Sequence, residues 1–219
     1  MTIAKRYIFT GIALAVFLVA LVFGVRLIHG TPSNEHYENI KIKGPDHAPI
    51  RMVVYSDFQC PACRMALASI EELRSEFSNV IRVEFRHFPL ERAHRWTVVA
   101  ASFAECAAEQ GKFWEFHDRM FLEQPTWSKI EDPLPIFANY SQELNLNRQV
   151  LEQCLENPKT LEKIRREHSM GVKQNVQSTP TIFINGHPLV GGLQLKAQGR
   201  EVVLEELKKL GIKPENLKS

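Results

Sequence analysis

The stretch from residue 50 to residue 77 constrains the fold more than any other part of the chain. It opens with an apolar, β-rich run, IRMVVY (50–55), which suits a strand buried on both faces. The cysteine-containing segment DFQCPAC follows, and apolar residues then recur at spacings of three and four, as in an amphipathic helix. A strand that leads directly into such a helix is typical of a βαβ unit with a parallel sheet. The sequence therefore predicts an α/β fold.

The later part of the chain supplies the remaining elements. The run VIRVEFRHF (80–88) alternates between two faces. Helical patterns dominate from about residue 92 to residue 176, and TIFINGHPLV (181–190) contains two β runs around Asn-Gly, a strong hairpin signal. A final amphipathic helix is expected from about Leu195 to Leu210. On the alternating strand, Ile81, Val83 and Phe85 share one face, and Arg82, Glu84 and Arg86 share the other.

These patterns divide the chain into five parts. Residues 1–28 are expected to form a membrane helix, and residues 29–48 a polar linker with a short edge strand near residues 40–42. Residues 49–91 and 177–219 are expected to build the sheet domain. The helical block at 92–176 is too long for a simple crossover, so we interpret it as an inserted subdomain.

The N-terminus predicts the compartment. Lys5 and Arg6 precede an uncharged apolar run of about 19 residues (7–25), which spans roughly 28 Å as a helix, about one hydrocarbon core. No pattern of small residues follows it, which favours an uncleaved signal anchor over the alternative, a cleaved signal peptide. Positive charge before the span places the rest of the chain outside the membrane, where disulfides persist.

Composition excludes several classes of function. The 27 basic and 25 acidic residues are interspersed, so no basic stripe indicates nucleic-acid binding and no acidic tail indicates disorder. Only 4 cysteines are present, which excludes a small disulfide-dense scaffold.

Two of the cysteines flank the start of the first predicted helix. Pro61 suits the first helical position, so Cys60 lies at the exposed N-terminal end of the helix. Cys63 continues the buried stripe backwards by one turn. That stripe consists of Ala66, Ile70, Leu73 and Phe77.

This placement favours redox chemistry. Unpaired N–H groups and the helix dipole stabilise a thiolate at Cys60, and such cysteines have pKa values of roughly 3.5–7.5. Cys60 is then the nucleophile, and the covered Cys63 resolves the mixed disulfide. A zinc site is the first alternative, but no second C-x-x-C or suitably spaced histidine pair accompanies the motif, so no metal is expected. A purely structural disulfide is the second alternative, and so short a loop gains little chain entropy. The histidines available as zinc ligands are His87, His94, His117 and His168.

Four segments, in order, resemble the DsbA-like thiol-disulfide oxidoreductases of the thioredoxin superfamily. They are YSDFQCPAC, FRHFPL (85–90), AAEQGKFWEFHD (107–118) and STPTIFINGHPL (178–189). The resemblance covers about residues 38–210. It implies a thioredoxin-like fold with an inserted helical subdomain and no metal or organic cofactor, because the dithiol itself carries the electrons.

The resemblance also implies a second element of the site. Pro180 is expected to follow a cis peptide bond beside the cysteine pair, which would free the Thr179 backbone to pair with an extended client. An ordinary trans proline that opens a strand is the alternative. The helical block is expected to form a cap with an apolar groove, and most of its aromatic residues are expected to lie in the core. They are Trp96, Phe103, Phe113, Trp114, Phe116, Phe121 and Trp127.

Two positions depart from the pattern of these relatives. Val54 stands where many relatives carry a buried acid, so Cys63 must exchange protons with water or another group, for which Asp57 and Glu84 are candidates. Ala62 stands where the strongest oxidants carry histidine. With Pro61 it tunes the redox pair, and we expect the pKa of Cys60 to be higher than in an Ala62→His variant.

Cys106 and Cys154 both lie on predicted apolar helix faces. In an oxidising compartment we expect them to form a structural disulfide, the alternative being two free buried thiols. Closing a loop of about 49 residues would contribute roughly 4 kcal/mol as an upper figure.

Together these observations predict a membrane-tethered, extracytoplasmic enzyme that introduces disulfides into exported proteins through Cys60 and Cys63. The resemblance implies reduced or unfolded exported clients, a quinone-linked membrane thiol oxidase of the DsbB or VKOR type as partner, and a location on the outer side of the bacterial cytoplasmic membrane. No dimerisation region is evident, which favours a monomer. A disulfide reductase or isomerase is the first alternative. A chaperone-like binding module with incidental cysteines is the second.

Overall fold

The computed structural model describes residues 41–213, all of which belong to one compact unit. The predicted membrane helix (1–28) and most of the predicted linker lie outside the described residues. Within residues 41–213, no helix is long and apolar enough to cross a membrane.

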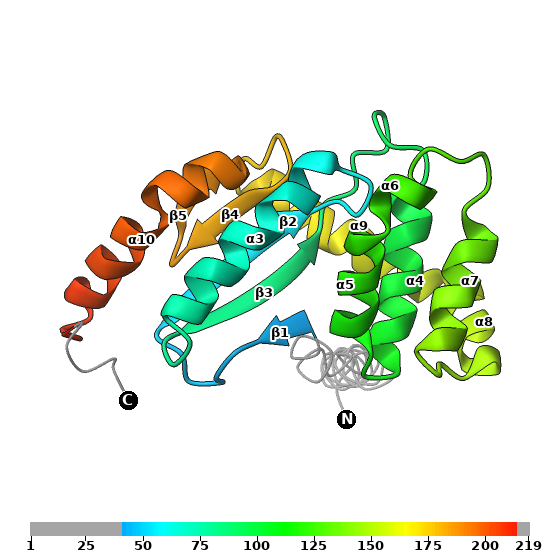
Figure 1. Ribbon diagram of the computed structural model, residues 1–219, viewed down its shortest axis with the longest axis horizontal. Coiled ribbons are helices and arrows are strands. Elements are labelled where there is room, and N and C mark those ends of the chain that lie inside the picture. The colour runs from blue at the N-terminus through cyan, green and yellow to red at the C-terminus, as the bar shows by residue number, and fades with distance from the viewer. Residues whose placement is uncertain (1–40, 214–219) are drawn as a thin grey trace, which may run out of the picture. The chain divides into compact units, whose positions relative to one another are not determined.

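The described part of the chain contains a five-stranded sheet with the order β1-β3-β2-β4-β5 (Figure 1). Strands β2 and β3 run parallel, from the pair Ile50 and Ile81 to the pair Ser56 and His87, and helix α3 (Pro61–Glu76) connects them. The other three pairings are antiparallel. The predicted βαβ unit is therefore confirmed. The strands are β1 (Ile42–Lys43), β2 (Ile50–Ser56), β3 (Ile81–His87), β4 (Thr181–Ile184) and β5 (His187–Val190).

Helices cover both faces of the sheet. Helices α3 and α10 (Gly191–Lys209) pack on one face, against alternate residues of β2 such as Met52 and Val54. Helix α9 (Pro158–Lys173) lies on the other face, over Tyr55 (Figure 1). A Cβ added to Gly171 of α9 would lie 2.7 Å from the Phe88 ring, so glycine permits this close approach.

The predicted hairpin is confirmed and the last helix is longer than expected. Asn185 and Gly186 have φ values of 45° and 91°, the left-handed conformation that a tight two-residue hairpin turn requires. Helix α10 begins at Gly191 rather than near Leu195. The side chain of Gln194 accepts a hydrogen bond of 2.6 Å from Val190 N, which satisfies one donor at the helix start and compensates for poor helix formers there.

The predicted helical block is present between β3 and β4, and its first helix begins at Thr97 rather than near residue 92. Of the seven aromatic residues named in the sequence analysis, five are buried, whereas Trp96 and Trp114 are partly buried. Most of these aromatic residues therefore lie in the core, as expected. The helices before α9 are α4 (Thr97–Glu109), α5 (Phe113–Leu122), α6 (Gln124–Trp127), α7 (Leu134–Glu143) and α8 (Arg148–Glu156).

A disulfide joins Cys106 of α4 to Cys154 of α8 across 48 residues of sequence. Both residues are at least nine-tenths buried. Closing a loop of this length stabilises the fold by roughly 4 kcal/mol through the lower chain entropy of the unfolded state. The disulfide expected between these two cysteines is therefore present.

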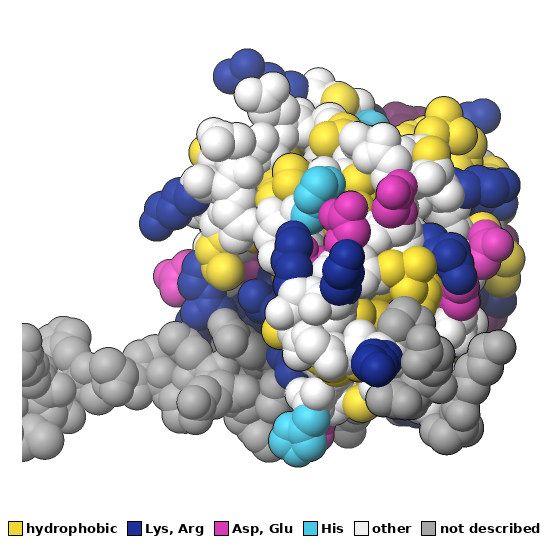
Figure 2. All heavy atoms as spheres, turned by 90° about the vertical axis from the view of Figure 1, so that its left-hand side faces the viewer, with side chains coloured by type: hydrophobic (Ala, Val, Ile, Leu, Met, Phe, Trp, Pro, Cys, Tyr) yellow, Lys and Arg dark blue, Asp and Glu magenta, His cyan; other side chains and the backbone are white. Residues whose placement is uncertain are grey.

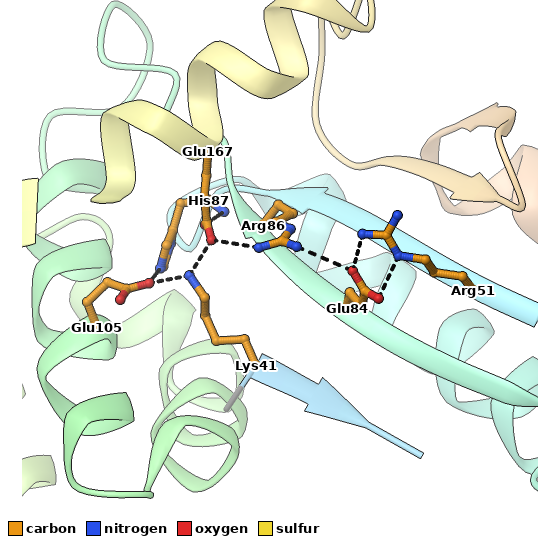
Figure 3. Close-up of polar contacts among 7 residues, drawn as sticks. All are labelled: Lys41, Arg51, Glu84, Arg86, His87, Glu105 and Glu167. Carbon is orange, nitrogen blue, oxygen red and sulfur yellow. Dashed lines mark hydrogen bonds and ion pairs between the residues drawn. The ribbon is translucent and has the colours of Figure 1, made fainter. Parts of the chain in front are cut away.

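The polar face of β3 does not point to solvent. Glu84 and Arg86 are 2% and 6% exposed. Glu84 accepts hydrogen bonds from Arg51 Nε at 2.6 Å and from Arg82, and Arg86 bridges Glu84 to Glu167 of α9 (Figure 3). The alternation of β3 was predicted correctly, but its charged side is buried because its arginines and glutamates neutralise one another.

Lys41 extends this network from the end of the predicted linker. Its ammonium contacts Glu105 of α4 and lies 2.6 Å from Glu167, while His87 Nε2 lies 3.0 Å from Glu105 (Figure 3). His87, Glu105 and Glu167 offer ligand atoms within 4.8 Å of one another, a spacing that suits a metal ion. Lys41 already places a positive charge between the two carboxylates, so the described residues neutralise this cluster by themselves.

The surface around the end of α10 carries both signs of charge. Lysine and arginine side chains on this face lie among acidic, polar and hydrophobic ones rather than in a continuous stripe (Figure 2). Exposed ion pairs on such a surface, for example Arg200 with Glu76, contribute little to stability.

Candidate active site

The cysteine pair lies where β2 ends and α3 begins. Cys60 is the N-cap residue of α3, with extended backbone angles, and Pro61 occupies the first turn. The Cys60 carbonyl accepts hydrogen bonds from Cys63 N at 3.1 Å and Arg64 N at 3.3 Å. Both sulfurs are reduced, and Cys63 is 2% exposed on the helix face that packs against the sheet. The helical spacing therefore predicted the orientation of Cys63 correctly.

A second loop approaches the pair from β4. The Thr179–Pro180 peptide bond is cis, and Cys60 Sγ lies 3.5 Å from the Thr179 carbonyl oxygen. Pairing of Tyr55 with Thr181 brings the start of β4 beside the end of β2, which places this loop over the cysteines. Gly191 N donates to the Pro180 carbonyl at 2.8 Å and ties the loop to the start of α10.

Cys60 is less accessible than the sequence predicted. Its side chain was expected at an exposed helix end, but the residue is only 6% exposed. The cis-proline loop covers it on one side. From α6, Gln124 Nε2 donates to the carbonyls of Phe58 at 2.7 Å and Cys60 at 3.0 Å, which holds the cysteine loop against the helical block.

The environment shifts the pKa values of the two thiols in opposite directions. The pKa of Cys60 is lowered to about 5, mainly by a hydrogen bond from Cys63. Hydrogen bonds from Thr179 and from the backbone N–H groups of Cys63 and Ala62 contribute as well, and together they outweigh burial, which would raise the pKa. Burial raises the pKa of Cys63, and the neighbouring Cys60 raises it further. At neutral pH the reduced pair therefore holds a thiolate at Cys60 and a thiol at Cys63.

The structure removes both candidates for proton exchange with Cys63. The Asp57 carboxylate accepts hydrogen bonds from Leu90 N at 2.9 Å and contacts His94 Nδ1 at 2.7 Å, and only its backbone N approaches Cys63 Sγ, at 3.5 Å. Glu84 lies on the opposite face of the sheet among arginines. Neither candidate carboxylate therefore contacts the thiol, because Glu84 lies on the other side of β3 and the Asp57 carboxylate is held by Leu90 N and His94.

Sequence reasoning missed two residues that contribute to this site. Gln124 lies in a four-residue helix for which the sequence offers no signal. His117 of α5 lines a small cavity with Cys63, Ser56, Val54 and Pro180. His117 stands four positions after Phe113 and four before Phe121, a spacing that places all three on one helix face. The sequence therefore contains a signal that His117 lies on an apolar face.

The cis-proline loop also carries an unsatisfied group. Among the described residues, Thr179 Oγ1 is buried and makes no hydrogen bond of ordinary geometry, although Thr179 lies close enough to Cys60 to help lower the pKa of that thiol. A buried hydroxyl without a partner is unfavourable by about 1–3 kcal/mol, so its persistence next to a reactive cysteine is informative. It is available to a group that enters the site.

A sheet of this order, a C-x-x-C pair at the start of α3 and a cis-proline opposite it form a site with the chemistry for thiol-disulfide exchange. Residues 38–200 match the sequence profile of the thioredoxin family. The chain therefore belongs to that family.

Solved structures share the fold at low sequence identity. Oxidised BdbD from Bacillus subtilis has a TM-score of 0.69 and 20% identity, over 82% of this chain and 97% of that chain. A thioredoxin-like oxidoreductase from Silicibacter pomeroyi has a TM-score of 0.65 and 20% identity, over 81% and 99%. Wolbachia pipientis alpha-DsbA1 has a TM-score of 0.64 and 21% identity, over 78% and 94%.

Curated relatives are longer proteins. The chain is 32% identical over 166 residues to Na(+)/H(+) antiporter NhaA 1 from Salinispora arenicola, which covers 76% of this chain and 24% of that protein. A relative named NhaA 3 from Salinispora tropica is 31% identical over 172 residues, 78% of this chain and 25% of that protein. The chain thus spans about a quarter of the length of these relatives.

Proposed function

We propose that the protein introduces disulfides into exported proteins through the Cys60–Cys63 pair. The observation that supports this proposal most strongly is the difference between the pKa values of the two thiols. The pKa of Cys60 is lowered to about 5, and that of Cys63 is raised. A stabilised thiolate favours the reduced pair over the disulfide, and a pair that prefers to be reduced oxidises other thiols.

The proposed reaction has two exchange steps. A client thiolate attacks Cys60 Sγ of the disulfide, the Cys60–Cys63 bond breaks, and Cys63 leaves as a thiolate that takes up a proton. A second client thiolate then attacks the client sulfur of the mixed disulfide, and Cys60 leaves as a thiolate. Two electrons pass from the client to the cysteine pair, so no further cofactor is required.

The cis-proline loop is proposed to hold the client. Cys60 Sγ lies 3.5 Å from the Thr179 carbonyl, so a chain bonded to Cys60 would run beside the backbone of this loop. An extended client segment can pair there as an added strand, and the unpartnered Thr179 hydroxyl offers one more hydrogen bond.

The location and partners are part of the proposal. A membrane anchor at residues 1–28 would hold the domain outside the bacterial cytoplasmic membrane, facing the periplasm or cell exterior. The Cys106–Cys154 disulfide supports an oxidising compartment. A quinone-linked thiol oxidase of the DsbB or VKOR type would reoxidise the pair, and the protein would act as a monomer on reduced or unfolded clients.

The equilibrium reduction potential of the pair tests the direction of electron flow. We expect the potential, measured in a glutathione redox series, to lie above that of the glutathione couple, and the Ala62→His variant to raise it further. Histidine next to Cys60 would lower the pKa of that thiol, and one pKa unit corresponds to about 1.4 kcal/mol. A potential well below the glutathione couple would indicate a reductase instead. An Ala62→His variant with an unchanged potential would contradict our account of Ala62.

A further inference from the structure

The resolving thiol requires a proton acceptor that the active-site loop does not provide. Cys63 is 2% exposed and its pKa is raised by burial, so it is protonated at neutral pH and must lose its proton before it can close the disulfide. Val54, which lines the same cavity as Cys63, is apolar, and the carboxylates of Asp57 and Glu84 are bonded to His94 and to arginines.

His117 lies on the other side of the space beneath Cys63. A cavity of about 30 Å³ is lined by Cys63, Ser56, Val54, Pro180 and His117, together with apolar side chains. A water molecule needs at least about 10–15 Å³, and the polar groups among the lining residues are those of Ser56, Cys63 and His117. The space therefore has room for one water between thiol and imidazole.

The same histidine also lines a way to the outside. A second cavity of about 160 Å³ lies next to the first and shares five lining residues with it: Leu67, Ile70, Val83, Trp114 and His117. Its wall includes the charged residues Asp118, Lys43, Glu71 and Arg74. Among the described residues that line these two cavities, His117 is the titratable side chain common to both.

The hydrogen bonding of His117 suits a proton carrier. Its Nδ1 lies 2.8 Å from Oδ1 of Asp118, and the Asp118 side chain is 62% exposed. This contact assigns a proton to Nδ1 and leaves Nε2 as the nitrogen that can accept one. An imidazolium formed in this way would be stabilised by the carboxylate of Asp118, which is in contact with solvent.

Aromatic packing keeps this imidazole neutral. The side chain is 6% exposed, with ring centroids of Phe121 at 4.9 Å, Trp114 at 5.1 Å and Phe85 at 5.2 Å. Burial lowers the pKa of His117, and Asp118 partly opposes this effect. Lys43 of β1 and His87 of β3 are the charged or titratable groups that lower it further from neighbouring strands. A neutral imidazole at pH 7 is ready to accept a proton.

We propose that His117 relays the proton of Cys63 across the cavity to Asp118 and solvent. The inference rests on the roles proposed for Cys60 and Cys63. When the disulfide closes, the proton leaves Cys63 Sγ through one water for His117 Nε2. The Cys63 thiolate then attacks Cys60 Sγ, the Cys60–Cys63 bond forms, and the partner sulfur leaves Cys60 as a thiolate. In the reverse direction, protonated His117 returns the proton to the Cys63 thiolate.

Closure can be timed with a chromogenic aromatic disulfide, dithiobis(nitrobenzoate). One equivalent added to the reduced protein releases a first coloured thiolate when Cys60 attacks it and a second when Cys63 closes the pair. We expect His117→Gln to slow the second release at pH 7 by about tenfold to a hundredfold, in the range of general base catalysis, and to leave the first unchanged. Asp118→Asn, on the surface, should slow it about two- to fivefold, because exposed charges couple weakly.

The pH dependence separates a relay from a packing role. In the wild type, the second release should slow as pH falls through the lowered pKa of His117. In His117→Gln it should instead rise about tenfold per pH unit, as expected for hydroxide acting directly, and meet the wild-type rate about one to two pH units above pH 7, where the deficit of the variant is made up. The matched control His168→Gln, whose ring stacks on Phe88 at 4.3 Å, should change neither phase.

The possible outcomes are distinct. A second release that keeps its rate and pH profile in both His117→Gln and Asp118→Asn would overturn the relay. If His117→Gln fails to fold, Asp118→Asn alone decides, since an unchanged second phase in that variant contradicts the proposal. A wild-type protein without a first release would contradict the roles of the cysteines instead, and so the proposed function.

Discussion

Replacing Cys60 with serine is expected to abolish oxidation of a reduced, unfolded client, with a loss of about a thousandfold or more. Loss of an essential nucleophile removes the covalent step itself, so little activity remains. A serine hydroxyl at this position would not ionise near neutral pH, although the N-cap geometry of α3 would be kept. The rate at which client thiols disappear, compared with the wild type at equal concentration, measures the effect.

The other cysteines provide the controls. Offered a client that carries a disulfide, Cys63→Ser should still attack it through Cys60: one client sulfur bonds to Cys60 and the other leaves as a thiolate. The mixed disulfide should then accumulate, visible as a mass increase equal to that of the client, because no Cys63 thiol is present to resolve it. The double variant Cys106→Ala/Cys154→Ala should retain exchange chemistry, because its disulfide joins α4 to α8 away from the Cys60–Cys63 pair. A Cys60→Ser variant with full activity would contradict redox catalysis and support the chaperone-like alternative.

Replacing Glu167 with alanine is expected to destabilise the protein by about 3–5 kcal/mol. Glu167 lies 2.6 Å from Lys41 Nζ and 3.3 Å from Arg86 Nη1, and accepts a hydrogen bond of 2.7 Å from His87 N. All of these groups are buried, so the substitution removes one of two carboxylates from both Lys41 and Arg86, which keep only Glu105 and Glu84. It also leaves His87 N without its acceptor, and breaking a buried ion pair from one side in this way is costly (Figure 3). Denaturant unfolding of the oxidised protein measures the loss.

An exposed pair supplies the matched control. Arg200→Ala breaks the ion pair between α10 and α3, with Glu76, and should change the unfolding free energy by less than about 1 kcal/mol. If Glu167→Ala were no more destabilising than Arg200→Ala, the buried network would not be a stabilising feature.

The stabilisation that this network provides should depend on pH, with losses at both low and high pH. Burial opposes the charge on Glu105, but Lys41 and His87 outweigh it and hold the pKa of Glu105 well below its usual range. This contribution is complete above the usual glutamate pKa and is lost as pH falls below it. Burial likewise opposes the charge on Lys41, but Glu167 and Glu105 raise its pKa, so its contribution is complete below the usual lysine pKa and is lost at higher pH.

The sequence predicted what is encoded locally. The order of strand, helix, strand and hairpin follows from periodicity and from Asn185-Gly186, and the inward orientation of Cys63 follows from its spacing to Ala66 and Ile70. These features depend on neighbours within a few residues, so a single sequence contains them.

Features that depend on packing between distant elements were not predicted. Lys41 lies in a polar stretch, and nothing near it in sequence indicates that it reaches Glu105 and Glu167, 64 and 126 residues later. His117 stands on an apolar helix face, but only the packing of α5 beside the sheet brings it to the cavity beneath Cys63. The extent to which the Thr179–Pro180 loop covers Cys60 likewise depends on how β4 pairs with β2.

A titration of the reduced protein tests the central claim most directly. Thiolate absorbance, followed against pH with the Cys106–Cys154 disulfide intact, reports the ionisation of Cys60. We predict a midpoint near pH 5 that is absent from Cys60→Ser. The thiolate then stabilises the folded, reduced protein increasingly as pH rises above 5, and that stabilisation is lost as pH falls through 5. A midpoint near that of a free thiol, about 8.5, would contradict the account, because Cys60 would then be neither an activated nucleophile nor the source of an oxidising pair.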